Sequence, residues 1–101
     1  MLAQLIKQMI DDTRQGKPAR RRLKNGLHMT VTTHKRERAT AYALIISRNK
    51  VYPSEQEWKT VLKHWPYKIE QVEPSKIVDN DRRMALKAEI PAPAIQEQMW
   101  R

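Results

Sequence analysis

The chain contains no cysteine and no phenylalanine, and only two of its 101 residues are glycine. The absence of cysteine excludes disulfide bonds, thiolate metal sites and a cysteine nucleophile. Two glycines are too few for a glycine-rich phosphate-binding loop. Polar side chains interrupt the apolar N-terminal segment 1–10, which therefore reads neither as a signal peptide nor as a membrane span. These absences are compatible with the cytoplasm, which is the intracellular location that we expect.

A chain of this length holds one hydrophobic core and is too short for two. Aliphatic residues must form most of this core, together with three Trp, three Tyr and five Met. We expect one domain over residues 1–90, followed by a proline-rich C-terminal tail over residues 91–101. No repeat in the sequence is strong enough to indicate a duplication.

The formal net charge is +9, and it is distributed unevenly along the chain. Residues 1–52 contain twelve basic and three acidic residues, whereas the remainder contains eight of each. An excess of charge that served only solubility would be spread along the chain, but a contact with a polyanion concentrates it. The first half therefore predicts a binding surface for an anionic partner.

Two segments predict helices. Apolar residues from Leu2 to Ile10 recur at three- and four-residue spacing, and this helix should end between Thr13 and Gly16, because Pro18 cannot continue it. The second helix, Ser54 to Trp65, begins with a serine that is followed three residues later by a glutamate, which is the pattern of a capping box. Residues 14–25, between the first helix and the first strand, predict an exposed basic connector.

Four segments predict strands: Leu27 to Thr33, Ala39 to Ser47, Tyr67 to Val72 and Arg83 to Ile90. The first and the last have side chains of different polarity on their two faces, whereas Ala39 to Ser47 is apolar on both faces and should be more buried. Asp79 to Asp81 predicts a turn between the last two. Strands grouped into hairpins, without strand-helix-strand alternation, indicate an α+β fold. We expect an antiparallel sheet of three to four strands in two hairpins, with both helices packed on one face, in the order helix-hairpin-helix-hairpin-tail.

The basic connector and the tip of the first hairpin are the predicted nucleic-acid-binding site. Arginine and lysine neutralise phosphates and release counterions, and the planar guanidinium of arginine binds phosphate through two hydrogen bonds. We expect a non-enzymatic nucleic-acid-binding protein. DNA is favoured somewhat over RNA, but the sequence does not separate the two, nor a duplex from a single strand. The predicted site residues are Arg14, Lys17, Arg20, Arg21, Arg22, Lys24, Lys35, Arg36 and Arg38.

A second interpretation is a small adaptor or regulatory subunit that docks on an acidic protein within a larger complex. The amphipathic first helix and the C-terminal tail are the candidate anchors, and in the tail Trp100 is the predicted partner-binding residue because a large aromatic side chain can dominate a contact. The oligomeric state is left open by the sequence. Trp58 and Trp65 are expected to be core residues. Tyr42, Tyr52 and Tyr67 could stack on bases, but core packing is the favoured interpretation for them as well.

Catalysis has little support in the sequence. His28-Met29-Thr30 matches half of the paired His-x-Thr motif of phosphoesterases, but neither His34 nor His64 begins a second copy. His28 and His34 are six residues apart on one strand, about 20 Å at ~3.3 Å per residue, which is too far for a shared metal ion. The carboxylates have ordinary structural explanations in helix ends and turns. We therefore expect no enzyme activity, no metal site and no cofactor.

Overall fold

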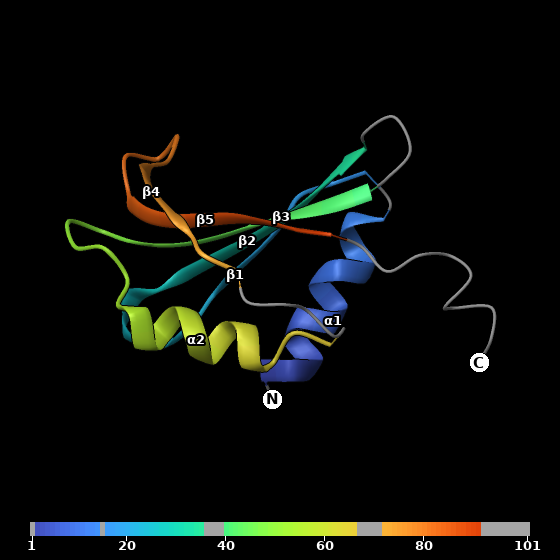
Figure 1. Ribbon diagram of the computed structural model, residues 1–101, viewed down its shortest axis with the longest axis horizontal. Helices are drawn as coiled ribbons and strands as arrows, with labels where there is room; N and C mark the ends of the chain where they lie inside the picture. The colour runs from blue at the N-terminus through green and yellow to red at the C-terminus, as the bar shows by residue number, and fades with distance from the viewer. Residues whose placement is uncertain (1, 15, 36–39, 67–71, 92–101) are drawn as a thin grey trace.

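Five antiparallel strands form one sheet in the computed structural model, which describes residues 2–14, 16–35, 40–66 and 72–91. The strands are arranged in the order β1-β2-β3-β5-β4, and both helices lie on one face of the sheet (Figure 1). The elements are α1 Leu2–Thr13, β1 Ala19–Arg22, the short 3-10 helix η1 Lys24–Gly26, β2 His28–Lys35, β3 Thr40–Arg48, α2 Glu55–Lys63, β4 Ser75–Val78 and β5 Met84–Pro91.

The predicted α+β class is correct, but the sheet has more strands than the sequence indicated. Residues 19–22, which we expected to belong to an exposed connector, form the edge strand β1 and pair with β2. The expected order helix-hairpin-helix-hairpin therefore lacks one strand, which precedes the first hairpin. Ser75–Val78 supplies the strand that pairs with β5, whereas most of the predicted strand 67–72 lies outside the described residues.

The local sequence accounts for the two helices. α1 ends at Thr13, where the amide of Gly16 donates to the Thr13 carbonyl, and Gly16 has the positive φ of 87° that a glycine adopts most readily. At the start of α2, the Ser54 hydroxyl accepts from the Glu57 amide, and the Glu57 carboxylate accepts from the Ser54 amide. The predicted capping box is therefore present.

The register of the sheet assigns the side chains to its two faces. Met29 lies opposite Ile46 and Val31 opposite Leu44 on the face covered by the helices, which we call the helix face. The intervening residues of β2, from His28 to His34, point to the opposite face, which we call the open face. The apolar and polar alternation of β2 predicted this division correctly.

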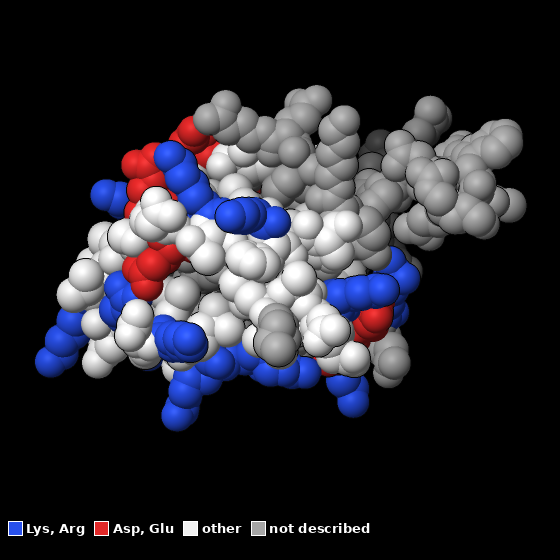
Figure 2. Space-filling view, turned by 90° about the horizontal axis from the view of Figure 1, so that it is seen from below, with Lys and Arg blue, Asp and Glu red and all other residues white. Residues whose placement is uncertain are grey.

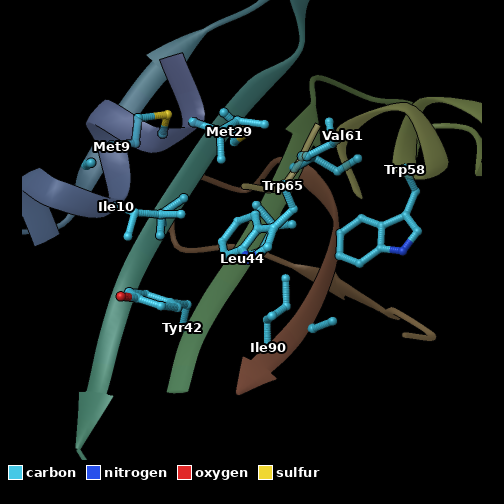
Figure 3. Close-up of a cluster of buried hydrophobic side chains, with 14 of the residues drawn as sticks. Met9, Ile10, Met29, Tyr42, Leu44, Trp58, Val61, Trp65 and Ile90 are labelled. Carbon is cyan, nitrogen blue, oxygen red and sulfur yellow. The ribbon is translucent and has the colours of Figure 1, made fainter. Parts of the chain in front are cut away.

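The core lies between the sheet and the two helices. Figure 3 shows α1, α2 and the central strands contributing side chains to one cluster, in which Leu44 of β3 is fully buried. Tyr42 and Trp65 contact each other edge to face with ring centroids 5.9 Å apart, and this places the end of α2 on the helix face. No helix in the described ranges is long and apolar enough to cross a membrane.

Candidate nucleic-acid interface

The three consecutive arginines 20–22 lie on β1, the edge strand of the sheet. Ala19 opens this strand with a side chain only 3% exposed, and Leu23 follows it half-buried against the core. These two apolar residues hold the charged segment against β2. Because residues 14–25 are so highly charged, the sequence predicted an exposed connector there and not a strand. Charged side chains on an edge strand also oppose pairing with another sheet, so β1 has a structural use for its arginines as well.

Alternation along β1 sends its arginines to different faces. Arg20 and Arg22 point to the open face, whereas Arg21, opposite Met29, points to the helix face. Arg21 Nη2 lies 3.0 Å from the Asp12 carboxylate of α1, and this half-buried ion pair fixes the helix against the strand. The three arginines therefore do not form one continuous phosphate-binding cluster.

Acidic side chains accompany three of the predicted binding residues. Arg14 lies 3.9 Å from Asp11 one turn earlier in α1, Arg20 is paired with Asp81 of the β4–β5 turn, and Arg21 is paired with Asp12. The pairs of Arg14 and Arg20 are about half exposed to solvent, where such ion pairs are weak and exchange partners readily.

Some of the other predicted basic residues are exposed within the described ranges, and others lie outside those ranges. Lys17, Arg22 and Lys24 are exposed, and within the described part of the chain none has an acidic partner. Lys35 ends β2, while Arg36, Arg38 and the tail residue Trp100 lie outside the described residues.

Four exposed cations thus follow the sheet margin from the entry to the exit of β1. We call Lys17, Arg20, Arg22 and Lys24 the β1 basic edge. Arg20 and Arg22 lie on the strand itself, about 7 Å apart at ~3.3 Å per residue, while Lys17 precedes the strand and Lys24 begins η1. Figure 2, which views the molecule from the helix side, shows Lys and Arg side chains around much of the outline, several of them along the lower margin, and mostly uncharged side chains over the centre.

The open face beside the β1 basic edge is polar on β2. Thr30 lies opposite Arg20 and His28 opposite Arg22, and Thr32 and His34 continue the same row. On β5, Lys87 lies opposite Ile45 of β3 on this face. The hydroxyl and imidazole groups next to the arginines are therefore available for hydrogen bonds.

The β4–β5 turn adds a cation that was not among the predicted binding residues. Arg83 Nη2 donates to the Gly26 carbonyl at 2.7 Å, and Nε lies 3.2 Å from the Ser47 hydroxyl, so this side chain ties the turn to η1 and β3. The hydrogen-bond partners of Arg83 are uncharged, so they do not neutralise its positive charge. Asp79 shapes the turn by accepting hydrogen bonds from the amides of Asp81 and Arg83. In the strand predicted over Arg83 to Ile90, Arg83 and Lys87 occupy alternate positions on one face, and this pattern is the sequence signal that both could lie on the open face.

His28 lies among these cations. Loss of solvent around the imidazole lowers the pKa of His28 below the ordinary histidine value, and the positive charges of Arg83, Arg22 and Arg20 lower it further, while Asp79 opposes them. The unprotonated ring is therefore favoured at neutral pH.

Three of the five aromatic residues expected in the core are buried, and a fourth, Tyr67, lies outside the described residues. Tyr42, Trp58 and Trp65 are each at most 6% exposed, so none of these three rings is accessible to a nucleic-acid base. Tyr52 is half-buried and lies under the ammonium group of Lys76, at 5.4 Å from the ring centroid. Across the ranges that the structure describes, no three His, Cys, Asp or Glu side chains gather in a group that could hold a metal ion.

No protein-family model matches the chain, and the searches of curated proteins and of solved structures gave no significant match either. The interpretation of the surface therefore depends on its own geometry and charge.

Proposed function

We propose that this protein binds nucleic acid without acting as an enzyme, and that the β1 basic edge makes the main contacts with the phosphates. The observation that supports this proposal is the set of exposed cations on and beside the edge strand β1: Arg20 and Arg22 within it, Lys17 before it and Lys24 after it. Only Arg20 among them has an acidic partner within the described residues, and that ion pair is half exposed. A phosphate can displace the carboxylate there at little cost.

The chemistry of this edge suits a phosphate backbone. Each cation that neutralises a phosphate releases condensed counterions, which supplies affinity independent of sequence. Arg22 can in addition donate two parallel hydrogen bonds to one phosphate. Thr30 on the adjacent strand lies opposite Arg20 and offers a hydroxyl donor beside it, and such contacts fix the register of a protein on a duplex.

Duplex DNA is the form that we propose as the ligand. Single-strand binders stack bases on exposed aromatic rings, whereas Tyr42, Trp58 and Trp65 are used in the core. β2 and β3 are flanked by β1 and β5 in the sheet, so the tip of the β2–β3 ribbon is the part that would reach the major groove of B-form DNA. The basic tip of this ribbon would reach a groove or a second backbone segment, with Lys35, Arg36 and Arg38 as the contacting residues.

The proposal is tested by binding of a fluorescently labelled DNA duplex, followed by anisotropy at about 0.1 M salt. The substitutions Lys17→Gln and Arg22→Gln together should weaken binding by up to about 60-fold, because each lost phosphate contact accounts for up to about eightfold at this salt concentration. The matched control is Lys7→Gln with Lys63→Gln, which removes the same charge from exposed positions on α1 and α2. Equal losses for both pairs would contradict a localised interface.

A further inference from the structure

An apolar groove lies between α1, η1 and α2, on the side of the molecule away from the open face. Its volume is about 790 Å³, and its lining is mostly apolar. Leu2 and Leu5 of α1 form one wall, Leu23 and Leu27 flank η1, and Val61 of α2 lies on the other wall. The groove therefore runs between parts of the chain that are distant in sequence.

The leucines of the groove are incompletely covered. Leu2, Leu5 and Leu23 pack against the core but are only half-buried. Complete burial of a leucine side chain is favourable, and three half-buried leucines in one concave surface form a preferred place for apolar side chains of a partner.

The groove is framed by Arg48 of β3. Its Nε donates to the Asn25 carbonyl of η1 at 3.1 Å, and its guanidinium forms an ion pair with Glu57 of α2. Glu57 is held in turn by the capping box at Ser54. Because one arginine ties η1 to α2, the groove is formed before any ligand binds, which lowers the entropic cost of binding.

The groove lining carries a net positive charge. Arg22 and Lys24 line it and have no acidic partner within the described residues, whereas the lining carboxylate of Glu57 is neutralised by Arg48. An apolar floor with two uncompensated cations on one side attracts an anionic ligand with an apolar face and repels a basic one.

We propose that this groove docks an amphipathic helix of a partner protein, with acidic residues beside the apolar stripe of that helix. Helices bind such grooves through apolar anchors at three- and four-residue spacing. The anchors would contact Leu2, Leu5 and Leu23, and the flanking carboxylates would pair with Lys24 and Arg22. The groove shares Arg22 and Lys24 with the β1 basic edge, so Leu2, Leu5 and Leu23 are the residues that distinguish helix docking from nucleic-acid binding.

The test uses two synthetic helical peptides of about 18 residues with the same leucine stripe, one flanked by glutamates and the other by lysines. Binding of each fluorescent peptide to the full chain is measured by anisotropy. The glutamate peptide should bind at least about fivefold more tightly than the lysine peptide, since two ion pairs replace two repulsions. Absence of binding by both peptides, or equal affinities, would overturn the proposal.

Charge reversal at one exposed residue makes the test specific to the groove. Lys24→Glu should reduce or invert the preference for the glutamate peptide, whereas Lys63→Glu, an identical change on α2 outside the groove, should leave it unchanged. Leu5→Asp should abolish peptide binding while affinity for duplex DNA stays within about twofold, because Leu5 is not one of the four cations of the β1 basic edge. An unchanged preference in Lys24→Glu would contradict docking in this groove.

Two other occupants are distinguished by the same samples. If sedimentation shows a dimer that Leu5→Asp converts to a monomer, the groove contacts a second copy of the chain. If the peptide binds only after residues 92–101 are removed, the groove receives the chain's own C-terminal segment. Either result would overturn a partner helix as the occupant.

Discussion

Arg20 and Asp81 form an ion pair that joins the edge strand β1 to the β4–β5 turn, with 2.5 Å between Arg20 Nη2 and Asp81 Oδ2. The two residues are 61 positions apart in sequence. The pair joins elements from opposite edges of the sheet, since β1 and β4 are its outer strands. It also places a carboxylate on one of the four cations to which we assign phosphate binding.

Removal of this carboxylate should strengthen nucleic-acid binding. In Asp81→Asn, Arg20 no longer has to exchange an aspartate for a phosphate. We expect the affinity for duplex DNA to rise by up to about eightfold at 0.1 M salt, with a change in unfolding free energy below about 1 kcal/mol, because exposed ion pairs contribute little to stability.

The control for charge alone is Glu55→Gln, which frees Lys59 from its ion pair on α2. It changes the net charge by the same amount and leaves the β1 basic edge as it is. Anisotropy titrations of both variants decide the question. An equal rise in affinity for the two would show that net charge, and not Arg20, limits binding.

Protonation of His28 should destabilise the fold. The pKa of His28 is lowered by loss of solvent first, and then by Arg83, Arg22 and Arg20. Below the ordinary histidine pKa of about 6.5, the unfolded chain therefore binds more protons than the folded chain, and stability decreases as the pH falls. Thermal unfolding followed by circular dichroism should show a smaller loss between pH 7 and 5 for His28→Gln than for the wild type.

His34 provides the comparison on the same strand. His34→Gln retains His28 and its charged neighbours, so it should lose as much stability between pH 7 and 5 as the wild type. If the two variants behave alike, the arginine cluster has no effect on the pH dependence.

Glu57 should give stability at neutral pH that is lost in acid. A hydrogen bond from Arg48 lowers the pKa of Glu57 most strongly, and hydrogen bonds from Ser54 lower it further against the opposing effect of burial. The contribution is complete above the ordinary glutamate pKa of about 4.3, and it disappears as the pH falls through the lower pKa of the folded state. Urea denaturation of Glu57→Gln should show a loss of about 1–3 kcal/mol at pH 7 that shrinks toward pH 3. A loss that is independent of pH would contradict the charged pair.

The central strand should respond differently on its two faces. Leu44→Ala removes a fully buried side chain on the helix face, and we expect it to lower the free energy of unfolding by about 2–5 kcal/mol. Ile45→Ala, the next residue on the same strand, changes a half-buried side chain on the open face and should cost less. Equal losses in urea denaturation would contradict the assignment of the faces.

The sequence predicts those elements of the fold whose signal is local. The capping box at Ser54 and Glu57 identifies the start of α2, and the alternation from His28 to His34 identifies β2 and its two faces. β1 has no local signal of this kind. Ala19 to Arg22 becomes a strand because β2 offers it a pairing edge, and this tertiary contact overrides the polar composition.

The candidate site is predicted only in outline. The sequence identifies the basic residues of the first half, but it does not show that Arg21 faces α1 or that Arg20 pairs with Asp81. Both facts depend on strand alternation and on a turn 61 residues away. Arg83 was assigned to the neutral half of the chain, yet it hydrogen-bonds to Gly26 next to the β1 basic edge.

The salt dependence of duplex binding tests the proposed interface most directly. For the wild type, log K plotted against log salt between about 50 and 200 mM should fall with a slope near −2.7 or steeper, since Lys17, Arg22 and Lys24 each contribute about −0.9. In the variant Lys17→Gln with Arg22→Gln, the slope should become shallower by up to about 1.8, while Lys7→Gln with Lys63→Gln should keep the wild-type slope. A weak slope in the wild type, or one that these two substitutions on the β1 basic edge leave unchanged, would contradict nucleic-acid binding through this surface.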